Sequence, residues 1–167
     1  MTNNETQVLR QMFPGISEDD LAELTGVAEL HTYPADTILC QEGEIENIFY
    51  AIITGQVEVT KQLDQDTQEV INRPGAGNFV GEIALVQEGA RTATVRTMEQ
   101  TTVLEIKGDD FVDMLYRNAS MAVRIMLQIT PRLRDIDLST IAHLRKQNAE
   151  LTRAYKELEQ KYQELAR

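Results

Sequence analysis

Phe79 to Leu85, with the sequence FVGEIAL, and Arg91 to Val95, with the sequence RTATV, are the segments that decide the fold and the site. Gly81 allows a turn in which the backbone comes close to a ligand, because no side chain stands between them. Glu82 to Leu85 can then form one helical turn whose free N–H groups favour an anion. Arg91 adds a planar fork of donors that can hold two phosphate oxygens. Together the two segments predict a pocket for a small phosphorylated ligand.

Glu82 adds a second chemical requirement to this pocket. A carboxylate cannot favour a phosphate by its charge. It can accept a hydrogen bond from a sugar hydroxyl, and it can hold Arg91 in position. An acid and an arginine at this spacing therefore indicate a ligand with both a phosphate and a ribose.

The two segments resemble the phosphate-binding cassette of cyclic nucleotide-binding domains, the family of the bacterial catabolite activator protein and of kinase regulatory subunits. The positions that fit are Gly81, Glu82, Ala84, Leu85, Arg91 and Ala93. Ala90 departs from the proline of many members, which affects only the rigidity of the loop. The resemblance covers roughly residues 16–133 and includes the segments Tyr33 to Leu39, Gly43-Glu44 and Phe49 to Gly55.

The resemblance implies a role for each site residue. Glu82 would bind the ribose 2′-hydroxyl, Arg91 the cyclic phosphate, and the amides of Ala84 and Thr92 would complete the phosphate cradle. The full predicted cyclic nucleotide site is Gly81, Glu82, Ile83, Ala84, Leu85, Arg91, Thr92, Ala93, Val59, Ile71, Val80, Ile136 and Asp137. The ligand implied is cAMP or cGMP. Thr92 does not decide between the two bases.

Five of these residues have a competing explanation. Val59, Ile71 and Val80 are expected on the base side of the pocket, although apolar residues in strands can equally be core. Ile136 and Asp137 fall near the position of the family's lid, where an apolar group could cover the purine and a carboxylate could accept from the adenine amine. Ordinary helix residues that face solvent would explain these two as well.

Short β-branched or aromatic segments separated by glycine predict a mainly β, α+β fold. We expect strands at Ile48 to Ile53, Gln56 to Thr60, Glu69 to Asn72, Thr92 to Thr97 and Thr102 to Ile106. Thr54-Gly55 is a hairpin signal between the first two. Many short strands with glycine turns suggest an antiparallel β-roll, that is a double-stranded β-helix or cupin-like barrel, with flanking helices.

Helices are predicted on both sides of these strands. One is expected from Ser17 to about Glu29, with Leu21, Leu24 and Val27 inward. A second begins near Asp109, whose side chain can cap it, and ends near Asn118. A third begins near Ser120, and one face of it carries Met121, Ile125, Ile129 and Leu133. Pro131 predicts a kink or a short break in it, because proline removes a backbone donor and clashes with the preceding turn.

From Ile141 the apolar pattern repeats every seven residues. Ile141, Asn148, Tyr155 and Tyr162 form one set, and Leu144, Leu151, Leu158 and Leu165 form the other. This predicts a coiled coil, and the inner Asn148 favours a parallel homodimer through residues 141–167. The alternative is a helix folded back on its own domain. The predicted organisation is an N-terminal segment at residues 1–15, the nucleotide domain at 16–134, and a hinge with the coiled coil at 135–167.

Composition limits the other classes of function. The 167 residues contain 27 acids and 16 bases, for a net charge of −11, which disfavours a nucleic-acid partner. The lone Cys40 and the lack of a signal-like start favour the cytoplasm, and no apolar segment approaches the roughly 20 residues of a membrane span. With only His31 and His143, a metal site is not expected. The heptads reach Arg167 without a helix-ending signal, so we expect an output domain to follow in the native chain.

Three functions follow as hypotheses. The preferred one is a sensor, not an enzyme, in which cAMP closes the helices after Asp109 and changes the geometry of the coiled coil; a cGMP-selective sensor is a variant of it. The second is a ligand-free dimerisation or docking module with a degenerate pocket. The third is a transcription regulator whose DNA-reading domain lies outside this chain, and the acidic composition disfavours it.

Overall fold

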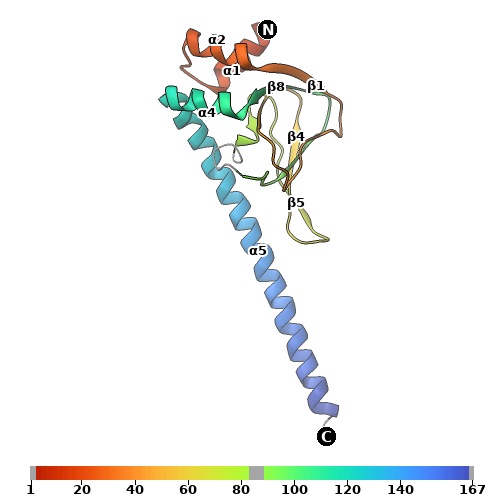
Figure 1. Cartoon of the computed structure of the whole chain (residues 1–167). Coiled ribbons are helices and arrows are strands. Elements are labelled where there is room, and N and C mark those ends of the chain that lie inside the picture. Colours follow the sequence, from red (N-terminus) through yellow and green to blue (C-terminus); the bar gives the residue numbers. More distant parts are fainter. Residues whose placement is uncertain (1–2, 83–88, 166–167) are drawn as a thin grey trace. The chain divides into compact units, whose positions relative to one another are not determined.

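The computed structural model describes residues 3–82 and 89–165, without the side chains of residues 132, 136, 139 and 165 (Figure 1). It separates into two compact units, residues 1–131 and 132–167, which are described one at a time. The helices in the described part are α1 (Asn3–Met12), α2 (Glu18–Val27), α4 (Gly108–Arg117) and α5 (Ala119–Leu165). The strands are β1 (Glu29–Tyr33), β2 (Ile38–Cys40), β3 (Ile48–Thr54), β4 (Val57–Gln62), β5 (Gln68–Asn72), β6 (Phe79–Val80), β7 (Thr94–Thr97) and β8 (Thr101–Lys107).

The strands form two antiparallel sheets. The first has the order β1-β8-β3-β6 and the second has the order β2-β7-β4-β5. The predicted mainly β fold with flanking helices is therefore confirmed. Within the described residues no ladder joins one sheet to the other, so the closed, cupin-like barrel is not confirmed, and a roll of two facing sheets describes the fold.

Strand β3 shows why this sequence needs a core on each side of the first sheet. Its side chains alternate between the two faces of the sheet, as in any strand. Phe49, Ala51 and Ile53 belong to a cluster with the helices, whereas Tyr50 and Ile52 belong to a cluster between the sheets. All five are buried, so the segment reads as a continuous apolar sequence instead of an alternating one.

The helices cover the outer face of the first sheet. Figure 1 shows α1, α2 and α4 gathered on one side of the strands. The cluster beneath them contains Leu9 and Met12 of α1, Leu24 of α2, and Phe111 of α4. The ring of Phe111 stacks on that of Phe49, with centroids 4.0 Å apart. Helix α1 was not predicted, although its buried Leu9 and Met12 carry most of its contribution to the core.

The hairpin predicted at Thr54-Gly55 is wrong. Strand β3 pairs with β6 and β8, and β4 pairs with β5 and β7, so the turn takes the chain from one sheet to the other. Gly55 has φ +87°, and a Cβ there would lie 2.5 Å from Thr101 Oγ1. Glycine is required because the turn passes directly over the start of β8. A turn signal marks the change of direction but does not say which strand becomes the partner.

The predicted helix starts are partly correct. Ser17 caps α2 by accepting a 3.1 Å hydrogen bond from the Asp20 N–H. Val27, expected inward, is 37% exposed. Asp109 does not cap α4; the cap position is Lys107, and the Asp109 carboxylate accepts from the Asn47 side chain instead.

Helix α5 runs from Ala119 through Pro131 to Leu165. Of the kink or short break predicted at Pro131, the break does not occur, and the kink stays a prediction. Asn118 caps its start by accepting a 3.0 Å bond from the Met121 N–H. Met121 and Ile125 are buried as predicted. No helix in the described ranges is long and apolar enough to cross a membrane.

The unit of residues 132–167 consists of the later part of α5. Both heptad sets are exposed in the described residues. The exposed fraction of their large apolar side chains runs from 44% for Ile141 to 70% for Tyr162. A long helix is thus present where the coiled coil was predicted, and its pairing stays a prediction.

Candidate functional site

The turn at Gly81 and the side chain of Arg91 lie together. Gly81 has φ +88°, a conformation that glycine adopts readily and other residues do not. The Arg91 Nη1 donates a 2.7 Å hydrogen bond to the Gly81 carbonyl. Arg91 is 3% exposed and Glu82, the next residue after the turn, is 2% exposed. The predicted meeting of the glycine turn and the arginine is therefore what the structure shows.

Arg91 has two further polar contacts. Its Nη2 donates to the Ile48 carbonyl at 2.5 Å, and its Nε donates to the Glu46 carboxylate at 3.4 Å. These bonds and the one to Gly81 use three of the five N–H donors of the guanidinium. The guanidinium carbon also lies 5.9 Å from the ring centroid of Tyr50, at the outer limit of a cation–π contact. Within the described residues, the other two N–H groups of the fork have no hydrogen-bond partner.

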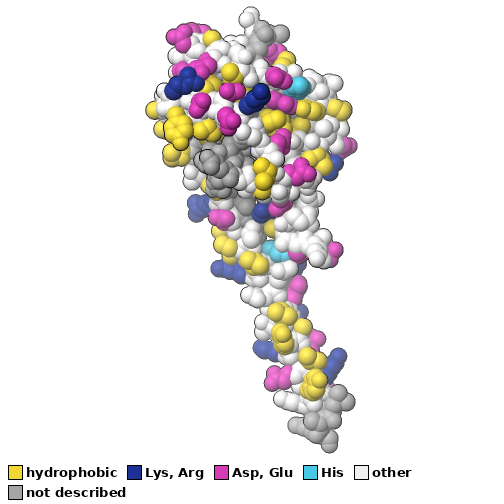
Figure 2. Space-filling view, viewed as in Figure 1, with side chains coloured by type: hydrophobic (Ala, Val, Ile, Leu, Met, Phe, Trp, Pro, Cys, Tyr) yellow, Lys and Arg dark blue, Asp and Glu magenta, His cyan; other side chains and the backbone are white. Residues whose placement is uncertain are grey.

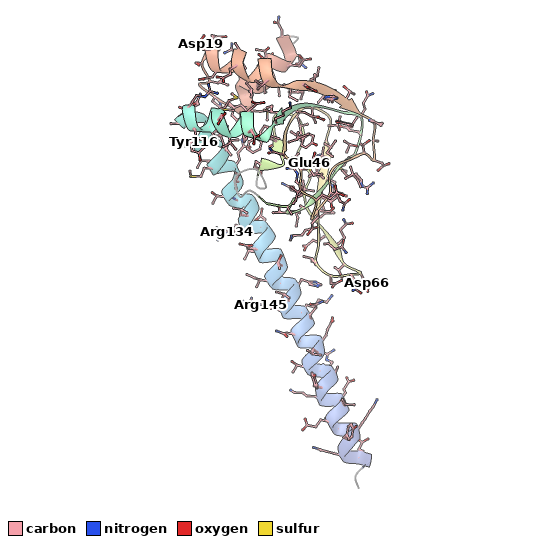
Figure 3. The ribbon with its side chains drawn as sticks, viewed as in Figure 1. Asp19, Glu46, Asp66, Tyr116, Arg134 and Arg145 are labelled. Atoms are coloured by element: carbon pink, nitrogen blue, oxygen red, sulfur yellow. The ribbon has the colours of Figure 1, made fainter. Side chains whose placement is uncertain are left out.

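Residues 41–47 form a loop that holds the arginine from one side; Glu46, within this loop, is labelled in Figure 3. The Arg91 N–H donates to the Glu44 carbonyl at 2.9 Å, and the Gly43 N–H donates to the Arg91 carbonyl at 2.9 Å. Glu46 then contacts the side chain of the same residue. One short loop thus fixes both the backbone and the guanidinium of Arg91.

Charges gather around the buried Cys40 beneath this arginine. Burial raises the pKa of the Cys40 thiol to about 12, the positive charge of Arg91 opposes the rise, and Glu46, Glu82 and Glu105 add to it. Arg91 and Glu82 thus act on the same thiol from nearby. Burial also raises the pKa of Tyr50, whose hydroxyl donates to the Glu46 carboxylate and lies 3.2 Å from the Leu39 carbonyl.

Part of the predicted cassette falls outside the described residues. Ile83, Ala84 and Leu85 belong to the segment 83–88, so the predicted helical turn and the amide of Ala84 stay predictions. Glu82 is the last described residue before that segment, and Arg91 follows soon after it. The Glu82 carboxylate is buried at the turn, where a ribose hydroxyl was expected.

Two of the three predicted base-side residues lie in or beside the core between the sheets. Val80 is buried in it, and Val59 packs against it. Ile71 is half-buried beside an irregular part of the β4–β5 ladder, where Val59 pairs with Asn72. Ala93 is 8% exposed. These positions fit either explanation given above, so contact with the base stays a prediction.

The two predicted lid residues, Ile136 and Asp137, belong to the unit of residues 132–167. Asp137 is exposed on α5. The side chain of Ile136 lies outside the described part. Their role as a lid therefore stays a prediction.

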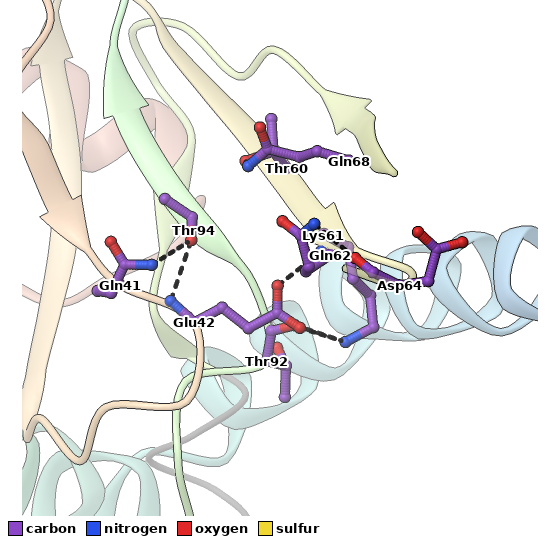
Figure 4. Close-up of polar contacts among 9 residues, drawn as sticks. All are labelled: Gln41, Glu42, Thr60, Lys61, Gln62, Asp64, Gln68, Thr92 and Thr94. Carbon is purple, nitrogen blue, oxygen red and sulfur yellow. Dashed lines mark hydrogen bonds and ion pairs between the residues drawn. The ribbon is translucent and has the colours of Figure 1, made fainter. Parts of the chain in front are cut away.

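A polar cluster beside the arginine was not found by sequence analysis (Figure 4). Lys61 of β4 donates to the Glu42 carboxylate at 3.1 Å and to the Thr92 carbonyl at 2.9 Å. The other Glu42 oxygen accepts from the Gln62 N–H at 2.7 Å. Thr92 is the residue directly after Arg91. The alternation Val57, Val59, Lys61 could have flagged a lysine on an inward face of the strand.

The remaining features of the surface do not suggest another chemistry. In the parts of the chain that are described, no group of three or more His, Cys, Asp or Glu side chains could hold a metal ion. Figure 2 shows acidic side chains spread over the visible face of residues 1–131.

Comparison with known proteins gives the family. The profile of the cyclic nucleotide-binding domain matches residues 30–118. The "cAMP-activated global transcriptional regulator CRP" of Haemophilus influenzae is 31% identical over 107 residues, which are 64% of this chain and 48% of that protein. The cGMP-dependent protein kinase egl-4 of Caenorhabditis elegans is 33% identical over 88 residues, 50% of this chain and 11% of that protein.

A solved structure supports the same fold. The catabolite activator protein of Thermus thermophilus has a TM-score of 0.68 at 21% identity, covering 79% of this chain and 62% of that one. The shared fold is a β-roll with flanking helices. The chain belongs to the cyclic nucleotide-binding domain family, because the family profile covers more than half of it. It spans about half the length of the bacterial regulators it matches.

Proposed function

We propose that this chain is a cAMP-binding regulatory module and that Arg91 is its phosphate ligand. The observation that carries the proposal is the buried guanidinium held against the Gly81 turn at 2.7 Å. A buried arginine that has two N–H groups without a partner among the described residues is suited to an anionic ligand. Glu82, buried at the same turn, would accept from the ribose 2′-hydroxyl. No step in this role requires a catalytic group.

The ligand would compete with contacts inside the protein. The cyclic phosphate carries one negative charge, and Glu46 presents another to the same guanidinium. Binding would weaken the contact between Glu46 and Arg91, and thereby loosen the loop of residues 41–47. A ligand shifts a conformational equilibrium only through different affinities for the two states. The exchange of Glu46 for phosphate supplies such a difference.

The response would pass to the helices that follow β8. In this proposal α4 and α5 rearrange on binding, with Ile136 and Asp137 in the lid, and the rearrangement changes a parallel homodimeric coiled coil at residues 141–167. The exposed apolar residues of the two heptad sets support self-association, because such a row of side chains is otherwise left in water. The activity that this switch would control belongs to a further domain or partner. We place the module in the cytoplasm, without nucleic acid as its own partner.

Thermal denaturation with cAMP, cGMP and AMP tests the proposal. A ligand at a hundred times its dissociation constant stabilises the folded state by about 2.7 kcal/mol. For a chain of this size we expect cAMP to raise the Tm by about 5–10 °C. AMP, which lacks the ring-closed phosphate, should have little effect. No shift with either cyclic nucleotide at millimolar concentration would contradict the proposal.

A second candidate is a docking module that binds no nucleotide. It is favoured by one observation, that Gly81, Ile48 and Glu46 already satisfy three donors of Arg91. The same thermal experiment separates the two candidates. A larger shift with cGMP than with cAMP would instead support a cGMP-selective sensor.

A further inference from the structure

Lys61 occupies an unusual position in β4. It alternates with Val57 and Val59, both of which pack in or against the core between the sheets, so it shares their face of the strand. Its side chain is 22% exposed. Lysine is seldom this buried without a partner. A partner for its ammonium group is therefore required.

The ammonium group has two partners from two different segments. The Glu42 carboxylate, 23% exposed, lies 3.1 Å away and supplies the counter-charge. The Thr92 carbonyl accepts a hydrogen bond from Lys61 at 2.9 Å. Figure 4 draws Lys61, Glu42 and Thr92 together. Glu42 is itself fixed, because its N–H donates to Thr94 Oγ1 at 3.0 Å and its carboxylate accepts from Gln62. Lys61 thus joins β4, the loop of residues 41–47 and the segment after Arg91.

The bond to Thr92 completes a series of three peptide groups around Arg91. Glu44 accepts from the N–H of the first, and Gly43 donates to the carbonyl of the second. Lys61 binds the carbonyl of the third, between Thr92 and Ala93. Because a peptide group is planar and trans, fixing its carbonyl also fixes the direction of its N–H. Each peptide group near the predicted phosphate is therefore held by a separate contact.

We propose that Lys61, with Glu42 as its counter-ion, is a positioning residue for the phosphate-binding segment of residues 91–93. Its charge is neutralised by Glu42, so it acts on the orientation of the Thr92–Ala93 peptide and not as a direct phosphate ligand. A correctly oriented segment distinguishes the two exocyclic oxygens of a cyclic phosphate. This inference rests on the proposed function, since it requires that the segment binds a cyclic phosphate.

The test replaces Lys61 by methionine, which keeps the length of the apolar stem. The probes are cAMP and the Rp and Sp phosphorothioates of cAMP, in which sulfur replaces one exocyclic oxygen or the other. For Lys61→Met we expect cAMP affinity to fall about tenfold, in line with the cost of small misplacements in binding sites. The ratio of the two phosphorothioate affinities should move at least about threefold toward one. Lys61→Arg should restore most of the ratio.

Hydrogen exchange on the free protein gives a second readout. Amides of residues 91–93 should exchange faster in Lys61→Met than in the wild type, because a charge-assisted bond has been lost. The matched control is Lys107→Met, since Lys107 is an exposed strand lysine. It should leave the affinity ratio and the exchange unchanged.

The outcomes separate the two proposals. If the wild type binds cAMP but Lys61→Met keeps its phosphorothioate ratio, the positioning role is wrong and the proposed function stands. An equal loss for both phosphorothioates also overturns it, because that result indicates a general charge or stability effect. If the wild type binds none of the probes, the proposed function fails, and the positioning role fails with it.

Discussion

The guanidinium of Arg91 donates a 2.7 Å hydrogen bond to the backbone carbonyl of Gly81, ten positions earlier in the chain. The two residues depend on each other sterically as well. A Cβ added to Gly81 would lie 2.5 Å from Arg91 Nη1 and 3.0 Å from the Ile48 carbonyl. The glycine turn and the buried arginine are therefore parts of one arrangement, and each permits the other.

Gly81→Ala should displace Arg91. The substitution adds a side chain at φ +88°, which costs about 1–3 kcal/mol, and it also forces the guanidinium to move. Gly77→Ala is the matched control, because Gly77 has φ +82° but nothing within 4 Å of an added Cβ. Urea unfolding should show a larger loss of stability for Gly81→Ala, and calorimetry should show loss of cAMP binding in that variant alone. Equal effects of the two substitutions would contradict the steric coupling.

Glu46→Gln should strengthen cAMP binding. The variant removes the negative charge that shares Arg91 with the phosphate, while the amide oxygen can still accept from Tyr50. A gain of about 0.5–1.5 kcal/mol, or roughly 2- to 12-fold in Kd, is expected from the lost competition. Glu44→Gln provides the control, since Glu44 is exposed and only its carbonyl contacts Arg91. Unchanged or weaker binding in Glu46→Gln, measured by calorimetry, would show that Glu46 does not compete.

Arg91→Leu should abolish binding and also destabilise the fold. The substitution removes the guanidinium, which donates hydrogen bonds to the Gly81 and Ile48 carbonyls. An unsatisfied buried acceptor costs about 1–3 kcal/mol. Arg91→Lys keeps the charge and should be more stable than Arg91→Leu, yet bind cAMP weakly, because an ammonium group cannot form the planar fork. Urea unfolding and calorimetry on both variants measure the two effects separately, and tight binding by Arg91→Leu would exclude Arg91 as the phosphate ligand.

Stability should fall in alkaline solution. Burial raises the pKa of Cys40 from 9.0 to about 12, and burial with the hydrogen bond to Glu105 raises the pKa of Tyr33 from 10.0 to about 12. The folded state thus holds these protons more tightly than the unfolded chain. Their stabilisation is complete below about pH 9 and is lost as the pH rises toward 12. The urea midpoint should drop between pH 8 and pH 11, with a smaller drop in the Cys40→Ala, Tyr33→Phe double variant; an equal drop in both proteins would contradict this assignment.

Leu151→Glu combined with Leu158→Glu should convert a dimer to a monomer. These leucines are 56% and 52% exposed within the unit of residues 132–167 and occupy inner positions of the predicted coiled coil. Charges at paired inner positions would repel each other. Lys156→Glu, which lies off the seam of the heptads, is the control and should remain dimeric. Sedimentation analysis measures both, and a monomeric wild type would exclude the coiled coil.

The sequence predicted the site best at positions where few other residue types could do the same chemistry. Gly81 and Arg91 could be predicted to meet because a glycine turn and an arginine at that spacing have a specific chemical use. Five of the eight strands in the described part, β3, β4, β5, β7 and β8, could be predicted because β-branched residues cluster there in short segments. The pairing of the strands could not be predicted. Gly55 marks a turn, but the chain crosses to the other sheet there, and pairing depends on contacts between residues distant in sequence.

The residues that hold the site in position could not be predicted from the sequence either. Glu46 and Glu42 lie in an acidic loop where several carboxylates are equivalent by pattern, and only the fold shows that one contacts Arg91 and the other Lys61. Helix α1 has an apolar face too short to stand out, and it is stabilised by packing on β3. Local patterns identify the ligand-facing residues better than the residues that hold them.

The most direct measurement is a crystal structure of the chain grown with saturating cAMP. We expect the cyclic phosphate beside the Gly81 turn, with two of its oxygens within about 3 Å of Arg91 nitrogens, and Glu82 on the ribose hydroxyl. A nucleotide bound elsewhere, or a site without nucleotide in which Arg91 keeps all its contacts to Gly81, Ile48 and Glu46, would contradict the assignment of Arg91 as the phosphate ligand.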